Sequence, residues 1–286
     1  MSKIIIDIEV RPYRKPEWML MQVWNGSLGT GLYTPELSSD IDVTNVVLPD
    51  MEYYYGLRSF GDHRGSGVEK VVQEDKYEIV SHELKHFVGM LCNGNPSAVS
   101  LLWLPNKFYP FLSSAAKHMM DNRWLFSTQR FITATCHLIE DYTRKLRTSY
   151  EWRNDLEKLV GFGKREKEHI RSFGYSTKHA ANALRLIRML DEYMDTQQLN
   201  VHRISDQNEL VSIKLGGLTY EDVAGYIQDE MNALAKKAVK LNGHQKNPDM
   251  DKVNKMCCDV VRLVYEEAKS TKDWLENMPL NTEVMQ

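Results

Sequence analysis

The hydrophobic periodicity of the chain changes once, near residue 110, and this change limits the folds open to it. Upstream, the apolar runs IIIDIEV, MLMQVW, IDVTNVVL and KYEIV alternate with Gly, Pro and Ser, which is typical of strands separated by turns. Downstream, the spacing is helical near 111–150, 151–170, 176–198, 219–241 and 249–276. The sequence therefore predicts an α+β protein, with a sheet domain at 1–110 and an all-helical domain at 111–286.

One helix is expected inside the first half, in the segment SHELKHFVGMLCNGNP. Its apolar residues fall on a single helical face, which would pack on the sheet: Leu84, Phe87, Val88 and Leu91. We expect Ser81 to cap its start, and Gly94 with Pro96 to end it.

Composition excludes several classes of protein. The 36 basic and 39 acidic side chains give a net charge of −3, so the overall balance does not call for a nucleic-acid partner. The four cysteines have no C-x-x-C spacing, which argues against a zinc site or a disulfide framework. The N-terminal apolar run is too short for a signal peptide, and no segment is long enough to span a bilayer. We expect a soluble, cytoplasmic protein.

Two aspartates, Asp40 and Asp42, stand one residue apart at the start of a predicted strand. Side chains alternate along a strand, so both would project from one face and repel each other unless a cation lay between them. Mg²⁺ takes one or two carboxylates and completes its shell with water and substrate phosphates. Upstream, a turn at Gly26 and Ser27 could offer N–H groups and a hydroxyl to those phosphates. A solvated strand edge after an ordinary turn is the alternative.

The same stretch resembles a known signature. GSLGTGLYTPELSSDIDV is similar to the Gly-Ser and Asp-x-Asp pattern of the DNA polymerase β superfamily of nucleotidyltransferases. With LPDMEYYYGL, LKHFVGMLCNGNPSAVSLLWLP, FGYSTKHAANALRLIRML and NELVSIKLGGLTYEDV, it resembles successive blocks of the polymerase-β-like family linked to RNA repair pathways. These blocks run from Gly26 to Val223. The resemblance implies a polymerase-β-type nucleotidyltransferase sheet with packed helices, completed by the helical domain.

The resemblance also implies site residues. Gly26 and Ser27 match the phosphate-contacting pair, and Asp40 and Asp42 match the metal-binding pair. Glu78 stands where the family usually has aspartate, and it would serve as third metal ligand and base. Asp75 is the alternative third carboxylate, and an exposed acid at a strand end is the other interpretation of either residue.

Positive charge for a triphosphate has to come from elsewhere in the chain. Where the family continues with DVRG, this sequence has Val43-Thr44-Asn45, so the basic residue expected beside the metal site is missing. On the helix expected from Ser176, Lys178, Asn182 and Arg185 share one stripe, and Lys178 matches a Lys-His element of the family. Asn182 stands where histidine is expected. We therefore assign nucleotide binding to Lys178 and Arg185, with a solvated helix face as the alternative. His179 could be a structural residue.

A glycine-rich segment from Arg58 to Lys70 adds further basic residues. With His63 and Arg64 it could form a mobile basic flap over the site, or it could be an ordinary surface loop.

Taken together, the resemblance implies transfer of a nucleoside monophosphate from a nucleoside triphosphate to an acceptor hydroxyl, with Mg²⁺, or Mn²⁺ in its place, and release of pyrophosphate. Family analogy favours an RNA end as acceptor, while a protein hydroxyl or a small molecule stays open. A non-catalytic nucleotide-binding regulatory protein, a metal-dependent phosphohydrolase and a structural or interaction module are the other classes considered.

Overall fold

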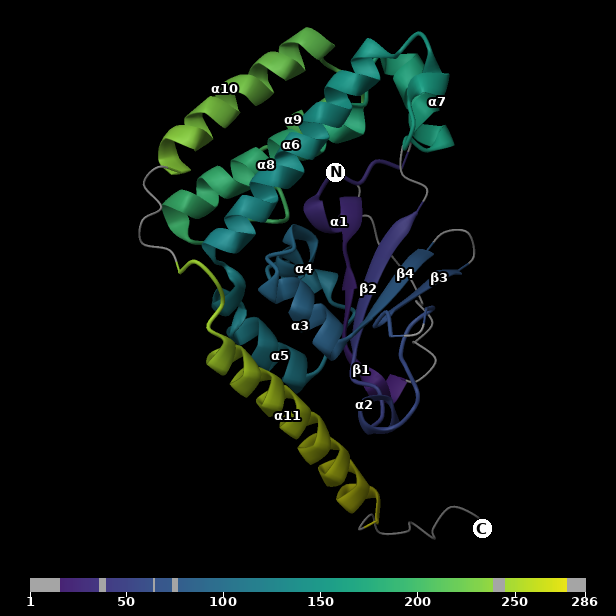
Figure 1. Ribbon diagram of the computed structural model, residues 1–286, viewed down its shortest axis with the longest axis vertical. Helices are drawn as coiled ribbons and strands as arrows, with labels where there is room; N and C mark the ends of the chain where they lie inside the picture. The colour runs from purple at the N-terminus through teal and green to yellow at the C-terminus, as the bar shows by residue number, and fades with distance from the viewer. Residues whose placement is uncertain (1–15, 36–39, 64, 74–76, 239–244, 277–286) are drawn as a thin grey trace, which may run out of the picture.

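The computed structural model describes residues 16–35, 40–63, 65–73, 77–238 and 245–276. A mixed β-sheet occupies one side of the molecule, and helices cover it and extend beyond it (Figure 1). The α+β class and the order of a sheet-containing half before a helical half are confirmed. The strand expected in IIIDIEV lies outside the described residues.

Within the described residues, the sheet has five strands in the order β3-β4-β2-β1-β5. Their bounds are Met19–Trp24 for β1, Ile41–Val47 for β2, Val68–Gln73 for β3, Tyr77–Glu83 for β4 and Phe111–Leu112 for β5. Only β2 and β4 run parallel; the other neighbours are antiparallel. The parallel pair places Asp42 directly opposite Glu78. Two carboxylates far apart in sequence are thus brought to one place by strand register.

Two of these strands differ from the sequence expectations. β5 lies in a segment expected to be helical, and β3 lies at the end of and beyond the expected Arg58–Lys70 loop. Phe111–Leu112 is too short to show a period of its own and is extended because it pairs with β1. The division into two domains at residue 110 stays a prediction, and one buried apolar cluster contains residues from both sides of it, including Met21, Phe87 and Leu184.

Short helices accompany the sheet. They are α1 (Gly26–Thr30), α2 (Glu52–Tyr55), α3 (Leu84–Cys92), α4 (Pro96–Leu101) and α5 (Ser114–Asp121). The expected apolar face of α3 is buried, but the expected cap is wrong: Glu83, not Ser81, accepts hydrogen bonds from the first backbone N–H groups, at Lys85 and His86. Ser81 remains inside β4, where its side chain meets a neighbouring strand.

The helical half is built around α8. Its helices are α6 (Gln129–Glu151), α7 (Lys164–Phe173), α8 (Thr177–Thr196), α9 (Gln207–Lys214), α10 (Tyr220–Ala238) and α11 (Met250–Glu276). It also has 3₁₀ turns at Arg123–Phe126 and Leu156–Lys158, and the sheet-containing half has them at Pro16–Trp18 and Asn106–Phe108. α8 packs against α6, α9 and α10 and is buried along most of its length. The helix expected over 151–170 is instead a 3₁₀ turn followed by α7, because Gly161 and Gly163 interrupt it.

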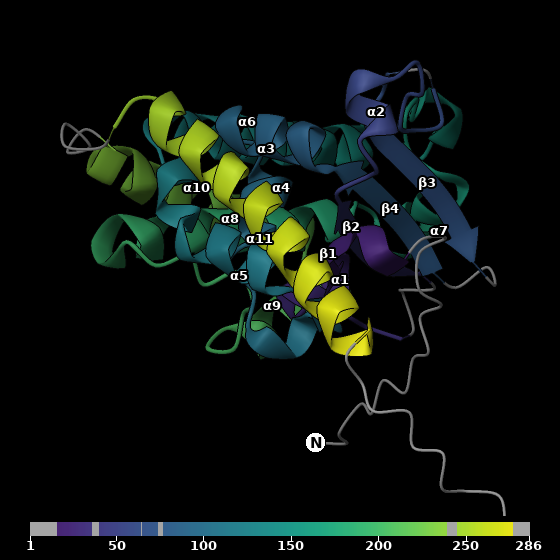
Figure 2. The same ribbon diagram turned by 90° about the horizontal axis from the view of Figure 1, so that it is seen from below.

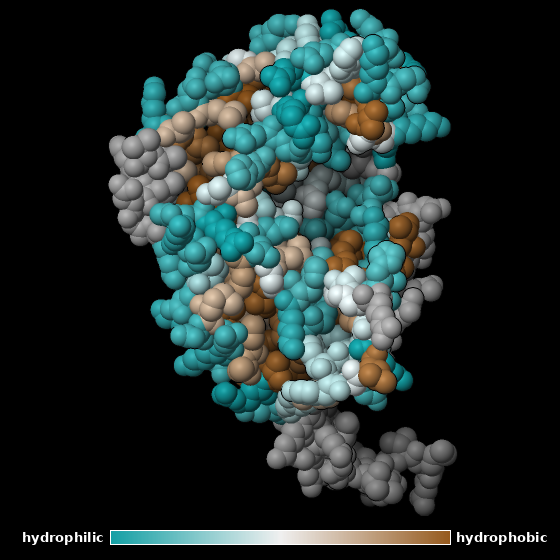
Figure 3. Space-filling view, viewed as in Figure 1, coloured by the Kyte–Doolittle hydropathy of each residue, from teal (hydrophilic) through white to brown (hydrophobic). Residues whose placement is uncertain are grey.

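The long helix α11 crosses the molecule on the side seen in Figure 2. It packs against α5, with Val253, Met256 and Val260 buried. The face shown in Figure 3 is largely hydrophilic over the helices, with apolar side chains in separate patches. Among the described residues, no helix combines the length and the apolar character that crossing a bilayer requires.

The two halves meet through backbone carbonyls at the end of α1. Thr30 O accepts from the backbone N–H of Arg203 (3.0 Å), Gly31 O from Gln207 Nε2 (2.7 Å), and Leu32 O from Lys214 Nζ (2.6 Å). The donors are themselves anchored. Arg203 is 2% exposed and pairs with Glu192 of α8 (2.7 Å) and with an aspartate next to α9. The end of α1 therefore has a fixed position relative to α8 and α9.

Buried polar side chains cross the centre of the sheet. Gln22 Nε2 donates to Asn45 Oδ1 (3.1 Å), and Asn45 Nδ2 donates to Ser81 Oγ (3.2 Å). All three residues are buried. In the stretch where a basic residue was expected, Asn45 instead links three adjacent strands, because it can both donate and accept.

We predict that Asn45→Ala lowers the free energy of unfolding by about 1 to 3 kcal/mol, because two buried polar groups lose their partner. Chemical denaturation measures the loss. Val72→Ala, at a position 60% exposed on β3, is the control and should change stability by less than about 0.5 kcal/mol. Equal effects of the two substitutions would contradict a structural role for this polar ladder.

Candidate active site

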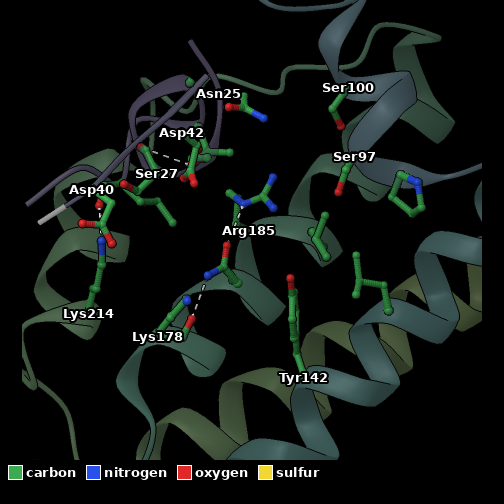
Figure 4. Close-up of a pocket in the computed structure, with 18 of the residues that line it drawn as sticks. Asn25, Ser27, Asp40, Asp42, Ser97, Ser100, Tyr142, Lys178, Arg185 and Lys214 are labelled. Atoms are coloured by element: carbon green, nitrogen blue, oxygen red, sulfur yellow. Dashed lines mark hydrogen bonds between the residues drawn. The ribbon is translucent and has the colours of Figure 1, made fainter. Parts of the chain in front are cut away.

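A cleft of about 760 Å³ lies between the sheet and the helical half. Residues from β2, β4, α1 and α4 line one side, and residues from α6, α7, α8 and α9 line the other. Figure 4 shows Asn25, Ser27 and Asp42 facing Lys178, Arg185 and Tyr142 across this space. The volume lies in the range of small-molecule sites. All seven residues predicted from the sequence line the cleft: Gly26, Ser27, Asp40, Asp42, Glu78, Lys178 and Arg185.

The start of α1 is held against β2. The backbone N–H of Asn25 donates to Asp42 O (3.0 Å), and Asn25 Nδ2 donates to Thr44 Oγ1 (2.8 Å). Gly26 has φ +55°, and a Cβ there would lie 1.7 Å from Asp42 Oδ2. Only glycine permits this approach. The expected turn at Gly26 and Ser27 is instead the first turn of a short helix, with Ser27 beside the carboxylate.

The three carboxylates differ in exposure. Asp40 precedes β2 and is exposed, whereas Asp42 and Glu78 lie within paired strands and are partly buried. Glu78 Oε1 forms an ion pair with Lys70 Nζ on β3, at 2.7 Å. Asp75, the alternative third carboxylate, lies outside the described residues.

The environment of Asp42 disfavours its charged form. Burial raises the pKa of this carboxyl, and the negative charge of Glu78 raises it further, while Lys178 opposes the shift. A cation placed between Asp42 and Glu78 would relieve both effects.

The donor set can be compared with what a divalent cation needs. In the described part of the chain, no three His, Cys, Asp or Glu side chains are grouped so as to hold a metal ion. Asp42 and Glu78 nevertheless form a pair of hard oxygen donors in the wall of the cleft, which Asp40 also lines. This set fits Mg²⁺ held by one or two carboxylates plus substrate oxygens, and does not form an all-protein cage.

Lys178 and Arg185 bring positive charge from α8. Lys178 is exposed at the cleft, while Arg185 is 8% exposed. The stripe to which nucleotide binding was assigned therefore lines the cleft, as expected. Arg185 Nε donates to Asn182 Oδ1 (3.4 Å), and no carboxylate of the described residues lies within ion-pair distance of it. Burial lowers its pKa to about 10. Burying a guanidinium without an acidic partner costs free energy, and an anion bound in the cleft would lower this cost.

Sequence reasoning missed two further cations, Arg165 of α7 and Lys214 of α9. Lys214 is buried, and burial lowers its pKa to about 8, with the charges of Lys178 and Arg165 adding to the effect. Lys214 sits in the quoted block NELVSIKLGGLTYEDV, but as one lysine at the end of a helix it carries no local signal. Whether the Lys214 side chain points into the cleft depends on how α9 packs against α1.

His179 is a structural residue. Its Nδ1 lies 2.8 Å from Glu166 Oε1 and 2.8 Å from Ser176 Oγ, and Ser176 Oγ donates to the same carboxylate oxygen at 2.6 Å. The rings of Tyr142 and Phe162 pack around it. This cluster joins α7 to α8 and fixes the direction of the adjacent Lys178.

The Arg58–Lys70 segment is only partly a loop. Arg58 forms an ion pair with Glu52 at 3.0 Å, and Lys70 is on β3. Neither Arg58 nor His63 lines the cleft. Arg64 lies outside the described residues, so the flap stays a hypothesis for that part of the segment.

A protein-family model matches most of the chain. The model described as the RNA repair pathway DNA polymerase beta family matches residues 14–259. The chain belongs to this family. Membership in the RNA repair pathway DNA polymerase beta family suggests nucleotidyltransferase activity. Searches of curated proteins and of solved structures give no significant match.

In this polymerase-β-family protein, we predict that Asp42→Asn raises the free energy of unfolding at pH 7 in metal-free buffer. The folded state raises the pKa of Asp42 above its ordinary value of 3.8, so the charged carboxyl opposes folding once the pH exceeds that value. Denaturation at pH 7 should show a gain that disappears near pH 3, where the carboxyl is protonated in both states. A loss of stability at both pH values would contradict this assignment.

Proposed function

We propose that the chain is a metal-dependent nucleotidyltransferase that moves a nucleoside monophosphate from a nucleoside triphosphate to an acceptor hydroxyl, releasing pyrophosphate. One observation carries the proposal. Arg185 is buried without an acidic partner among the described residues, and it faces the Asp42 side of the cleft across a space large enough for a nucleotide. A triphosphate with its cation would complement both walls. Family membership supports the same reading.

The roles follow from position. Lys178 and Arg185, with Arg165 and Lys214 nearby, would bind triphosphate oxygens, and the start of α1 at Gly26 and Ser27 would add backbone and hydroxyl contacts. Asp40, Asp42 and Glu78 would hold Mg²⁺, or Mn²⁺ in its place. When bound, that cation would neutralise charge on the triphosphate and acidify the attacking hydroxyl.

The reaction is an in-line displacement at the α-phosphorus. A bond forms from the acceptor oxygen to the α-phosphorus, the bond to the pyrophosphate oxygen breaks, and the hydroxyl proton passes to the Glu78 carboxylate. Glu78 can accept it where it stands, next to Asp42, once its ion pair with Lys70 loosens. The contribution of the protein is mainly positioning and charge.

An RNA end is the acceptor that the family description favours, with a protein hydroxyl or a small molecule as the alternatives. Incubation with each α-labelled triphosphate, Mg²⁺ and pools of RNA, protein and small molecules tests this directly. Label in RNA supports the full proposal, and label in protein or a small molecule changes the acceptor. Release of free nucleoside monophosphate without any acceptor would indicate a phosphohydrolase.

A non-catalytic nucleotide-binding protein is the second candidate, and the Lys70–Glu78 ion pair is the observation that favours it. In that ion pair Lys70 neutralises the Glu78 carboxylate, which the transfer reaction needs as a metal ligand and base. Nucleotide binding without any labelled product in the same experiment would select this reading.

We predict that Asp42→Asn and Glu78→Gln each lower transfer on the order of 100-fold or more, because each removes charge that acts mainly in the transition state. Asp40→Asn should have a similar effect if this exposed carboxylate is a ligand. Initial rates of pyrophosphate release measure the change. Asp229→Asn, on the exposed face of α10, is the charge-matched control. Wild-type rates in both the Asp42 and Glu78 variants would exclude this active site.

Nucleotide binding should depend on pH through Lys214. Its pKa is about 8, so the positive charge is present at pH 7 and is lost as the pH rises to 9. Titration calorimetry should show affinity falling by about tenfold over this range if the lysine makes a charge-assisted contact. Lys214→Met should bind weakly at both pH values, while Lys236→Met on α10 should behave as wild type. An unchanged pH profile in Lys214→Met would show that this lysine does not contact the nucleotide.

A further inference from the structure

A second cavity, of about 220 Å³, adjoins the candidate active site. It shares Asp42 and Glu78 with the main cleft and continues along the sheet away from α8. Thr44, Val80 and His82 form its floor on β2 and β4, and Phe87, Met90 and Ala98 close it from α3 and α4. One end of a group bound in this cavity would therefore contact the carboxylates of Asp42 and Glu78.

The chemistry of this cavity differs from that of the main cleft. Four cationic side chains line the main cleft, whereas no lysine or arginine is among the residues that line the second cavity. Its walls are mostly apolar. The cavity therefore fits an uncharged group, and the triphosphate belongs in the main cleft.

Two buried polar atoms mark the two ends of the cavity. Asn25 Oδ1 lies at the end near Asp42, and His82 Nδ1 belongs to the far end; neither has a hydrogen-bond partner in the described part of the chain. Asn25 uses its amide group on Thr44, so the oxygen is left as an acceptor. Buried polar atoms in native proteins normally have partners. A ligand with polar groups at both ends would supply them.

The spacing of the two ends sets the length of the occupant. Glu78 and His82 are four residues apart on β4, which corresponds to about 13 Å along a strand. A ribonucleoside has hydroxyls at one end and a hydrogen-bonding ring at the other, with flat apolar faces between them. A serine or tyrosine side chain has a polar group at one end only, so it would leave His82 without a partner.

We propose that the second cavity binds a ribonucleoside, and that this ribonucleoside carries the hydroxyl that attacks the α-phosphorus. The inference rests on the proposed function. The ribose lies at Asp42 and Glu78 with a hydroxyl donating to Asn25 Oδ1, and the base extends between Val80 and Met90 toward His82. The ribose oxygen forms the new bond to phosphorus, pyrophosphate leaves, and the hydroxyl proton passes to Glu78.

The state of His82 suits this role. Its ring stacks in parallel on His86, with centroids 5.3 Å apart, and burial together with that neighbour lowers its pKa to about 4. The imidazole is neutral at physiological pH, so its Nδ1 can either donate or accept, according to the tautomer.

Filling the cavity gives the first test. Met90→Trp adds bulk on the α3 wall, while Gly89→Trp adds the same side chain at the next position, where nothing lies within 4 Å of a Cβ. We expect Met90→Trp to raise the acceptor KM at least tenfold and to leave the nucleotide Kd unchanged. Gly89→Trp should change neither. Equal acceptor KM values in the two variants would overturn the proposal.

Removing the polar end gives the second test. With an oligoribonucleotide acceptor, His82→Ala should raise the KM about threefold to tenfold, as expected for one lost hydrogen bond. An acceptor whose terminal base is replaced by hydrogen should show a raised KM with the wild-type protein and no further increase with His82→Ala. Additive effects of the two changes would show that the base does not reach His82.

Crosslinking with the unmodified protein does not depend on the folding of any variant. An oligoribonucleotide ending in 4-thiouridine should crosslink within residues 77–92, which include β4 and α3, and crosslinks confined to α6–α10 would overturn the proposal.

Free uridine and the oligoribonucleotide are compared as acceptors, and labelling of either one supports a ribonucleoside site. Labelling of protein alone overturns this inference but preserves the transferase. No labelled product of any kind removes the proposed function itself.

Discussion

The geometry of the cleft depends on the hydrogen bonds between the end of α1 and the segment that leads into α9. Backbone carbonyls of residues 30–32 accept from Arg203, Gln207 and Lys214. The start of the same short helix is bonded to β2 at Asp42. One five-residue helix therefore transmits the position of the sheet to the helical half. These bonds add fixed directions to the apolar cluster that both halves share.

Charge is divided between the two halves in a way that suits a nucleotide with its cation. The sheet contributes the carboxylates through the parallel pairing of β2 and β4, while helices α7, α8 and α9 contribute the cations. The two groups face each other across the cleft at Asp42 and Lys178, while Asp40 and Lys214 lie side by side. Burial, reinforced by like charges nearby, raises the pKa of Asp42 and lowers that of Lys214. A ligand that carries both phosphate and a divalent cation would neutralise the carboxylates on one wall and the cations on the other.

Local pattern was enough to predict the fold class, the inner strands β1, β2 and β4 and the buried face of α3. The family resemblance supplied seven of the residues that line the cleft. Local pattern failed where structure depends on distant partners. β5 is too short to show a period, Glu83 replaces Ser81 as a cap because β4 continues two residues further, and Arg185 is buried by helices far along the chain. Lys214 enters the site only through the packing of α9. Such features are set by tertiary contacts, which a single sequence does not display.

The burial of Arg185 has a consequence for the amount of protein in a cell. An uncompensated charge in the interior makes the unliganded fold less stable than its packing would allow. An anion that binds to Arg185 pairs with this charge and raises the free energy of unfolding. Mass action sets the scale, about 2.7 kcal/mol when the ligand is at 100 times its Kd. Proteolytic lifetime would then follow the supply of nucleotide, so that the chain persists where its substrate is plentiful and is cleared where it is scarce.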